Sequence, residues 1–174
     1  MAWIVVCISQ IGGVGKSTEA RALVREATMG GLKTKLADLD TEQATSADWH
    51  RRRLSAGLPP AASVEIFSTA AQALSTTEAY DLLISDGPAQ ASKGILEIAK
   101  VADLVVQPTG ASLDDLIPAV KVFNGLLNDG IPRSKLIFSL SRIGTEAEEK
   151  DARELFCTTK LGHFSEGVFI RYWR

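Results

Sequence analysis

Ser9-Gln10-Ile11-Gly12-Gly13-Val14-Gly15-Lys16-Ser17-Thr18, or SQIGGVGKST, follows an apolar run at residues 4–8 and precedes a segment with helical spacing. The glycines let the backbone approach an anion closely, and the N-terminus of the next helix supplies N–H groups and a positive dipole end. Lys16 can reach the β- and γ-phosphates of a nucleotide, and the Ser17 hydroxyl can bind Mg²⁺. We therefore predict a phosphate-binding loop; the alternative is a glycine-rich turn with an exposed lysine.

The loop departs from the common spacing G-x-x-x-x-G-K-[ST], which requires a glycine at position 10. The chain has Gln10 there, and the next residue is Ile11, whose side chain has neither a charge nor a hydrogen-bond donor. The spacing therefore indicates a variant class of phosphate loop.

The composition is that of an ordinary globular protein. The chain has 174 residues, 45% of them hydrophobic and 23% charged, which predicts one domain over residues 1–174. A net charge of −2 gives no general attraction to nucleic acid or to an anionic membrane, so such binding would need a local patch. Cys7 and Cys157 lack metal-ligand spacing and are expected to be reduced structural thiols.

Two further observations concern location. No apolar run approaches the roughly 20 residues that a membrane span needs. The start of the chain lacks the basic flank and cleavage region of a signal peptide. We expect a cytoplasmic protein that does not associate with a membrane.

Short apolar runs alternate with helical patterns along the chain, which is typical of βαβ units around a parallel sheet. The fold class expected is α/β, with a doubly wound, mostly parallel sheet between two helical layers. The runs are apolar at most positions, as strands covered on both faces should be. The expected strands are residues 3–9, 34–39, 64–67, 80–86, 104–107 and 135–141.

Two later helices carry start signals. A helix over residues 116–127 is expected, with Asp115 as its cap, which would place Pro118 in the tolerated first turn. Thr145 and Glu148 form a capping box for the other helix.

Acidic residues end two of the expected strands. Asp86 lies at the carboxyl end of the strand at 80–86, where ligands of open α/β sheets bind, and it fits the role of holding Mg²⁺ directly or through water. The alternative is a cap on the following turn. Asp38 and Asp40 end the strand at 34–39, and a carboxylate there could orient water or Mg²⁺ beside a triphosphate. The D-x-D pattern alone is equally compatible with a structural role.

Together these motifs resemble the ParA/MinD family of deviant Walker A P-loop ATPases, in particular the short ParA-type partition proteins of plasmids and chromosomes. The family motif K-G-G-x-G-K-[ST]-T matches residues 11–18 except at its first position. The D-x-D motif followed by glutamine corresponds to Asp38, Asp40 and Gln43, and the D-x-P motif to residues 86–88. Residues 104–108 and 112–115 resemble the next strand and helix entry, and the resemblance covers residues 2–156.

The resemblance implies a site, cofactors and partners. The implied cofactors are ATP and Mg²⁺, and the implied partners are a second copy in a nucleotide-dependent dimer, non-specific DNA and a ParB-like protein. The implied catalytic residues are Lys16 and Asp40, and the implied metal-binding residues are Ser17, Asp38 and Asp86. The implied nucleotide-binding residues are Gly12, Gly13, Val14, Gly15, Lys16, Ser17, Thr18 and Ser141.

Two positions depart from the family pattern. Relatives carry asparagine near Ser141, where it reads the adenine ring, and serine makes fewer hydrogen bonds. The first lysine of the family motif reaches the partner's phosphates across the dimer, and such a charge is worth roughly 10³–10⁵ in rate in related phosphoryl transfers. Ile11 cannot do this, and Gln10 offers an amide but no cation. The resemblance therefore favours nucleotide binding over hydrolysis and predicts a weak Mg²⁺-dependent ATPase.

The basic run after the second expected strand is a candidate DNA contact, because phosphate contacts need only cations in register. Its residues are Arg51, Arg52 and Arg53. The alternative is a solvated helix face. A separate departure is the aromatic-rich end, residues 157–174, which has no match in the family. It is expected to be an atypical or truncated ending in which GVFIRYWR forms one more strand.

Three functions remain open from the sequence. The first is a ParA-like ATPase that acts in DNA partition through nucleotide-dependent dimerisation. The second is a nucleotide-binding switch with little or no hydrolysis, because Ile11 replaces the signature lysine. The third is a small-molecule ATP-dependent enzyme on the same fold, such as a dethiobiotin-synthetase-like ligase.

Overall fold

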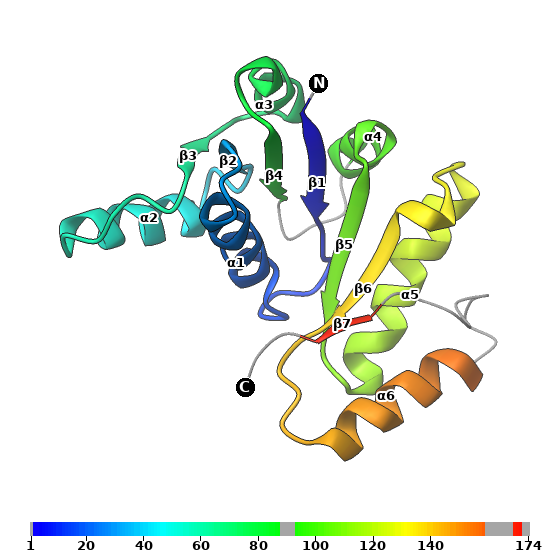
Figure 1. Ribbon diagram of the computed structural model, residues 1–174. Helices are drawn as coiled ribbons and strands as arrows, with labels where there is room; N and C mark the ends of the chain where they lie inside the picture. The colour runs from blue at the N-terminus through cyan, green and yellow to red at the C-terminus, as the bar shows by residue number, and fades with distance from the viewer. Residues whose placement is uncertain (1, 88–92, 159–168, 172–174) are drawn as a thin grey trace.

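A seven-stranded, all-parallel sheet forms the centre of the molecule, with the order β3-β2-β4-β1-β5-β6-β7 (Figure 1). The computed structural model describes residues 2–87, 93–158 and 169–171. Within them the strands are β1 (Trp3–Cys7), β2 (Thr34–Asp38), β3 (Ser63–Ile66), β4 (Leu82–Asp86), β5 (Leu104–Thr109), β6 (Leu136–Leu140) and β7 (Phe169–Arg171).

Helices connect the strands and cover both faces of the sheet. They are α1 (Lys16–Met29), α2 (Thr45–Ser55), α3 (Ala70–Leu74), α4 (Lys93–Val101), α5 (Leu113–Asn128) and α6 (Glu146–Thr158), with 3₁₀ turns η1 (Thr77–Ala79) and η2 (Arg133–Lys135). Right-handed crossovers place α1 and α2 on one face and α3 to α6 on the other, because the strand order reverses at β1. Figure 1 shows α2 and β3 extending away from the rest of the chain. Among the described helices, none is both long and apolar enough to cross a membrane.

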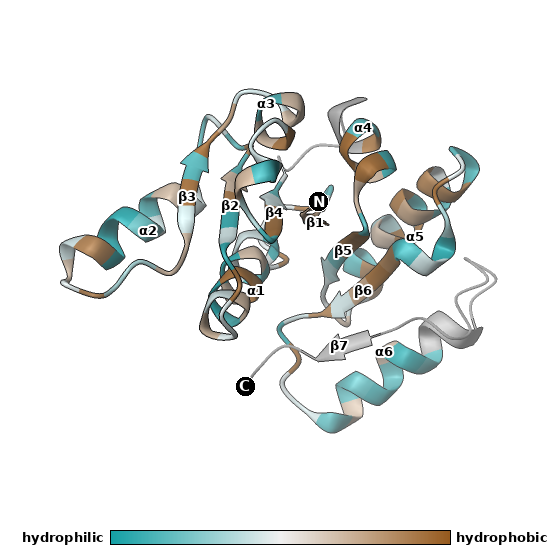
Figure 2. Cartoon of the chain, turned by 45° about the horizontal axis from the view of Figure 1, so that its top comes forward, coloured by the Kyte–Doolittle hydropathy of each residue, from teal (hydrophilic) through white to brown (hydrophobic). Residues whose placement is uncertain are grey.

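The core has one apolar layer on each face of the sheet. On one face α4, α5 and α6 pack on β1, β5 and β6, and the rings of Phe123 and Phe138 lie 4.3 Å apart between centroids. Figure 2 shows the apolar residues gathered on β5, β6 and α5. On the other face, Ala20 and Val24 of α1 pack against β1, β2 and β4.

The sheet places the glycine-rich loop at its topological switch point. β1 lies between β4 and β5, and Cys7 is in register with both Asp86 and Val106. The loop at 9–15 therefore leaves the carboxyl edge of the sheet where the two halves diverge, which is where ligands of open α/β sheets bind.

The expected α/β fold is confirmed, and each of the six expected strands overlaps an observed one. Thr145 and Glu148 form the expected capping box, because each side chain accepts a hydrogen bond from the other residue's backbone N–H. The expected strand in the aromatic end is present as β7, which pairs with β6. The rest of that ending, residues 159–168 and 172–174, lies outside the described residues, as does Pro88.

The cap expected for the helix at 116–127 was wrong. Ser112 is the N-cap of α5, and its hydroxyl accepts a hydrogen bond from the backbone N–H of Asp115, at 3.3 Å. The helix therefore begins at Leu113, and Pro118 lies inside it, beyond the first turn. Proline there removes the hydrogen bond to the carbonyl of Asp114, a cost that the buried apolar face of α5 must offset.

Candidate functional site

The glycine-rich loop has the backbone conformation that its sequence predicts. Gly13 and Gly15 have φ angles of +82° and +98°, in the left-handed region that side chains rarely adopt. A Cβ on Gly15 would lie at an ordinary van der Waals distance, 3.6 Å, from the Cβ and Oγ of Ser141, so the φ angle alone opposes a side chain there. Substitution at Gly15 is therefore strained, and the loop turns there directly into the N-terminus of α1.

Hydrogen bonds from both ends hold this loop in place. The Ser9 hydroxyl accepts from the N–H of Ile11 at 3.0 Å, and it donates to the carbonyl of the same residue at 2.9 Å. From the end of β6, the Ser141 hydroxyl donates to the carbonyl of Val14 at 2.5 Å. The guanidinium of Arg142 donates to the carbonyl of Gly13 at 3.1 Å. The hydroxyl of Ser141, expected to contact a base, thus also fixes the loop.

Lys16 and Asp86 form a buried ion pair beneath the loop. Nζ of Lys16 lies 2.6 Å from Oδ1 of Asp86, and the Asp86 side chain is fully buried. Oδ2 of Asp86 accepts a hydrogen bond from the Ser46 hydroxyl at 2.7 Å. The ion pair joins the first residue of α1 to the end of β4.

Asp38 is the register partner of Asp86 on the adjacent strand, and it is also fully buried. One of its oxygens accepts the N–H groups of Ser46 and Ala47 at 2.9 and 3.1 Å, and the other accepts the N–H of Asp40 at 3.1 Å. Asp38 therefore satisfies two N–H groups at the start of α2 that have no partner inside the helix. Burial raises the pKa of Asp38, the neighbouring Asp86 carboxylate adds to the rise, and these backbone N–H groups oppose it.

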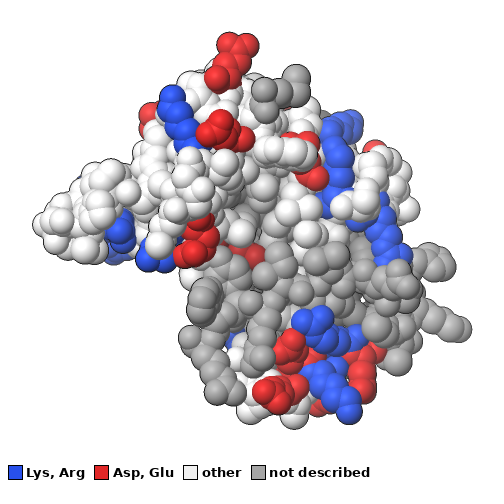
Figure 3. Space-filling model, in the orientation of Figure 1, with Lys and Arg blue, Asp and Glu red and all other residues white. Residues whose placement is uncertain are grey.

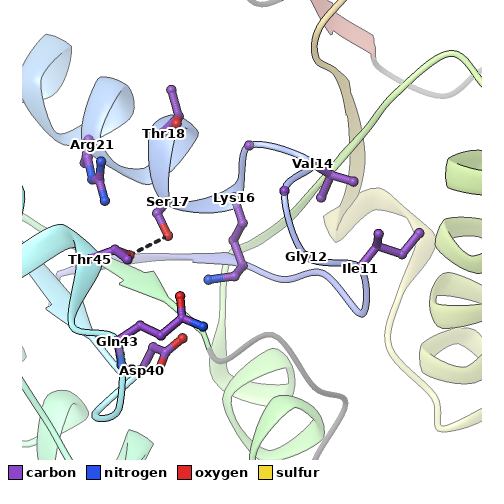
Figure 4. A pocket seen from close by; sticks show the side chains of 12 residues that line it. Ile11, Gly12, Val14, Lys16, Ser17, Thr18, Arg21, Asp40, Gln43 and Thr45 are labelled. Carbon is purple, nitrogen blue, oxygen red and sulfur yellow. Dashed lines mark hydrogen bonds between the residues drawn. The ribbon is translucent and has the colours of Figure 1, made fainter.

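The polar segment between β2 and α2 closes over the start of α1. The Thr45 hydroxyl donates to the Ser17 hydroxyl at 3.2 Å (Figure 4). Asp40 is half-buried, and its Oδ1 accepts the N–H of Gln43 at 3.0 Å. Ala44 has a φ angle of +45°, so the segment makes a tight turn before the helix. Asp40 and Gln43 are thereby brought to the mouth of the loop.

These elements surround a cavity of about 290 Å³ (Figure 4). Its lining residues are Ile11, Gly12, Gly13, Val14, Gly15, Lys16, Ser17, Thr18, Arg21, Asp40, Gln43 and Thr45. A second hollow of about 380 Å³ is lined by Gly13, Gly15, Thr18, Glu19, Ala22, Ser141 and Arg142. Gly13, Gly15 and Thr18 line both hollows, so the two hollows lie on opposite sides of the same loop. The expected loop residues and Ser141 all line this space.

The donor set at the cavity suits a hard cation better than a soft one. Ser17 offers a hydroxyl oxygen there, and Asp86 lies behind Lys16 with a carboxylate; oxygen ligands of this kind bind Mg²⁺. The described residues contain no cluster of three or more His, Cys, Asp or Glu that could hold a metal alone. Bound Mg²⁺ would therefore also need phosphate or water oxygens. The residues present fit a metal that arrives with a nucleotide.

Ile11 lies at the rim of the cavity. Its side chain is half-buried and points away from Lys16 in Figure 4. Gln10 is exposed and does not line the cavity. The position that would hold a second lysine in the resembled motif thus brings no charge to the phosphate-binding end.

The basic run on α2 is only partly available for DNA. Arg51 forms an ion pair with Asp48 at 2.7 Å, and Nε of Arg53 donates to the carbonyl of Pro59 at 2.6 Å. Figure 3 shows basic side chains on the α2 projection next to acidic ones. Arg51, Arg52 and Arg53 do not line the cavity, although Arg52 lies close enough to the lining residue Arg21 to add to the lowering of its pKa by burial.

Sequence reasoning missed Thr45, Ser46 and Arg21. Nε of Arg21 donates to the Ser46 hydroxyl at 3.2 Å, and that hydroxyl donates on to Asp86. Two signals were present in the sequence. Thr45 and Ser46 follow the D-x-D motif at a helix start, and Arg21 lies one helical turn after Ser17 on α1.

No protein-family model matches the chain, and no curated protein matches it. Solved structures do match. A proposed plasmid partition protein from Borrelia burgdorferi B31, bound to AMPPNP, has a TM-score of 0.70 and 15% identity, over 98% of this chain and 85% of that chain. The septum site-determining protein MinD of Pyrococcus horikoshii OT3, complexed with Mg-ADP, has a TM-score of 0.63 and 19% identity, over 87% of this chain and 77% of that one.

A third match is an enzyme that acts on a small molecule. Cobyrinic acid a,c-diamide synthase from Mycobacterium smegmatis, with bound ADP and magnesium, has a TM-score of 0.64 and 15% identity, over 92% of this chain and 83% of that chain. The chain therefore has the P-loop α/β/α fold found in ParA-like partition proteins and MinD ATPases. That fold also carries a small-molecule synthase.

Proposed function

We propose that this chain is a ParA-like protein that binds a nucleoside triphosphate, ATP by the resemblance, together with Mg²⁺. The observation that carries the proposal is the arrangement of the loop. Its glycines, the N-terminus of α1 and the Lys16–Asp86 pair meet at the carboxyl edge of the sheet around one cavity. The solved proteins with this fold include complexes with AMPPNP, Mg-ADP, and ADP with magnesium.

Several groups in and beneath the cavity have a role in this proposal. The backbone N–H groups of residues 12–18 bind phosphate oxygens, and Lys16 supplies a cation for the β- and γ-phosphates. Ser17 would bind Mg²⁺ directly, and Asp86, whose two oxygens bond to Lys16 and Ser46, would hold the ion through water. The ion would neutralise phosphate charge. Both side-chain oxygens of Asp38 accept hydrogen bonds from backbone N–H groups. Asp38 thereby keeps the start of α2 beside Asp86. The second hollow, beside Ser141, takes the nucleoside.

Hydrolysis is proposed to be slow. Asp40 lies at the cavity with one oxygen on the N–H of Gln43, and its other oxygen can orient a water molecule. The resembled family adds a lysine from the neighbouring subunit, and Ile11 cannot supply that charge. We infer a nucleotide-dependent switch that dimerises and associates with DNA, in which binding rather than turnover carries the signal. Arg51 to Arg53 remain the candidate DNA contacts, and a ParB-like protein remains the candidate partner.

The synthase match supports a second function. A small-molecule ATP-dependent enzyme would use the same phosphate loop and would turn over ATP only with its second substrate present. The described residues include a second hollow next to the loop, which could hold either a nucleoside or such a substrate. The partition function is preferred because the D-x-D motif is present and residues 12–18 match the family's loop motif after its first position.

Isothermal titration with ATP, ADP and AMPPNP, with and without Mg²⁺, tests the nucleotide proposal. Wild type is expected to bind all three and to bind ATP more tightly with Mg²⁺, whereas Lys16→Ala is expected to bind none. Lys121→Ala, on the exposed surface of α5, is the matched control. Turnover is then measured with and without DNA. No binding by wild type would refute the nucleotide proposal, and turnover that DNA leaves unchanged would count against a role in partition.

A further inference from the structure

Arg21 is a cation in the cavity that neither the phosphate loop nor its known motifs account for. It lies on α1 one turn after Ser17, is half-buried and lines the cavity. Helical side chains lean toward the helix N-terminus, so a long side chain at this position reaches back toward Ser17. Figure 4 shows the guanidinium on the same side of the cavity as the Ser17 and Thr45 hydroxyls.

The guanidinium is held in position from two sides. Nε donates to the Ser46 hydroxyl at 3.2 Å, and the guanidinium carbon lies 5.7 Å from the ring centroid of Trp49. Both contacts come from α2, and neither uses an Nη atom as a hydrogen-bond donor. Arg21 is therefore ordered before any ligand binds, which lowers the cost of using it as a ligand.

Among the described residues, no carboxylate bonds to Arg21. Within the part of the chain that the structure describes, its Nη atoms make no hydrogen bond and it forms no ion pair within 4.0 Å. The next arginine on the helix differs, because Arg25 pairs with Glu26 at 2.7 Å. Burial lowers the pKa of Arg21, while the carboxylates of Asp86 and Asp38 oppose that change. Arginine stays protonated in proteins, so this is a half-buried positive charge beside an anion-binding loop.

The position of Arg21 in the cavity indicates which phosphate of a nucleotide it would contact. The glycine loop and Lys16 form one end, and Arg21 lies at the other with Thr45, Asp40 and Gln43. A triphosphate whose inner phosphates rest on the loop extends its terminal phosphate toward this second end. A guanidinium there can form two parallel hydrogen bonds to phosphate oxygens.

We propose that Arg21 binds the terminal phosphate of the nucleotide from within the same chain, as the second cation of the site. The inference rests on the proposed nucleotide function and deepens it. Ile11 brings no charge to the cavity, so Lys16 and Arg21 are the basic residues that line it. Arg21 then makes the site prefer a triphosphate to a diphosphate without any residue from a second copy.

The test is the ratio of affinities for AMPPNP and ADP, measured by titration in Mg²⁺ for wild type and variants. Arg21→Gln is expected to weaken AMPPNP binding about tenfold or more while ADP affinity changes little, as loss of a charge-assisted bond to phosphate predicts. Arg21→Lys keeps the charge and is expected to retain most of the preference. Arg25→Gln, one turn further along α1, is the matched control and is expected to match wild type.

The same measurement separates this role from a purely structural one. If Arg21 only positions α2 through Ser46, Arg21→Gln and Ser46→Ala would weaken AMPPNP and ADP equally, and the proposal would be overturned. An unchanged AMPPNP-to-ADP ratio in a folded Arg21→Gln protein, with wild type binding both nucleotides, overturns the inference and leaves the proposed function standing. Failure of wild type to bind either nucleotide overturns both. If Arg21→Gln does not fold, the AMPPNP-to-ADP affinity ratio is measured on Arg21→Lys instead.

Discussion

Nζ of Lys16 lies 2.6 Å from Oδ1 of Asp86, and the two side chains are 10% and 0% exposed. A buried ion pair is costly to break from one side, because the remaining charge has no partner; typical losses are about 3–5 kcal/mol. Ser46 offers Asp86 one further hydrogen bond, but no second positive charge. The residue expected to bind phosphate is thus also a structural partner of the residue expected to bind the metal.

Lys16→Ala is expected to abolish nucleotide binding and to destabilise the free protein. Binding fails because the variant lacks the cation that the loop offers to the β- and γ-phosphates. Stability falls because Asp86 is left buried with only the Ser46 hydroxyl. Titration calorimetry and urea denaturation measure the two effects. ATP affinity equal to that of wild type would contradict the phosphate-loop assignment, whatever happens to stability.

Substitutions at Asp40 and Asp86 are expected to separate hydrolysis from binding. Asp40 is half-buried beside the cavity, so Asp40→Ala is expected to slow turnover while ATP stays bound. Asp86→Ala is expected to weaken Mg²⁺-dependent binding itself, since it removes the carboxylate beneath Lys16. Asp40→Asn is a useful control because its side-chain oxygen can still accept the N–H of Gln43. Equal losses of ATP affinity in the two alanine variants would refute this division of roles.

Glu19 is expected to make the protein less stable as the pH rises. Its side chain is buried in the first turns of α1, and its oxygens have no hydrogen bond of normal geometry to the described residues. Burial raises the pKa of Glu19 from 4.5 to about 7, and the nearby Ser139 hydroxyl opposes only part of the rise. Below pH 4.5 both folded and unfolded chains hold the proton, so Glu19 contributes nothing to the pH dependence there.

Between pH 4.5 and about 7 the unfolded chain releases the proton while the folded chain keeps it. Stability therefore falls across that window by up to about 3 kcal/mol and levels off above it. Glu19→Gln is expected to lose this dependence and to exceed wild type in stability at pH 8. Urea denaturation of both proteins from pH 4 to 8 measures the difference, with exposed Glu26→Gln as the control. If the free energies of unfolding of wild type and Glu19→Gln change with pH in the same way, Glu19 is not desolvated as described.

The fold could be predicted from local sequence patterns, which are clear at residues 3–9 and 80–86. Runs that are apolar on both faces predict strands of a covered parallel sheet, and β1 and β4 formed where such runs occur. The cap of α5 was misassigned because Ser112 and Asp115 are both good capping residues. Only the backbone geometry shows which of them stands at the helix start.

Only part of the site could be predicted from the sequence, because some of its contacts join residues that are far apart along the chain. The loop residues are contiguous, so spacing alone predicted their grouping at a strand-to-helix junction. The contacts among Arg21, Ser46 and Asp86 join three separate elements, with Ser46 and Asp86 separated by 40 positions. Serine and arginine are common on helix surfaces, so the positions of Ser46 after the D-x-D motif and of Arg21 one turn after Ser17 do not by themselves predict this contact. Such contacts become predictable once the strand order places β2 beside β4.

Ile11→Lys is expected to accelerate ATP turnover by about tenfold, starting from a very slow wild type. In the family that the loop resembles, the first lysine of the motif acts on the neighbour's nucleotide, and a charge of this kind can contribute far more than tenfold. The expected gain is smaller because a trans group docked imperfectly loses most of its effect. The backbone N–H and carbonyl of Ile11 both bond to the Ser9 hydroxyl, so the substitution should leave the loop conformation unchanged.

The acceleration by Ile11→Lys should rise with protein concentration, because the lysine needs a second copy to act on. Turnover is measured for wild type and variant across a concentration series at saturating Mg-ATP. Gln10→Lys, one residue earlier and exposed, is the control for a cation placed off the rim of the cavity, and no gain is expected from it. A gain that is independent of concentration would place the effect within one chain. If wild type already turns over ATP as fast as Ile11→Lys at every concentration, the missing lysine is irrelevant, and the proposal of a slow, switch-like protein falls with it.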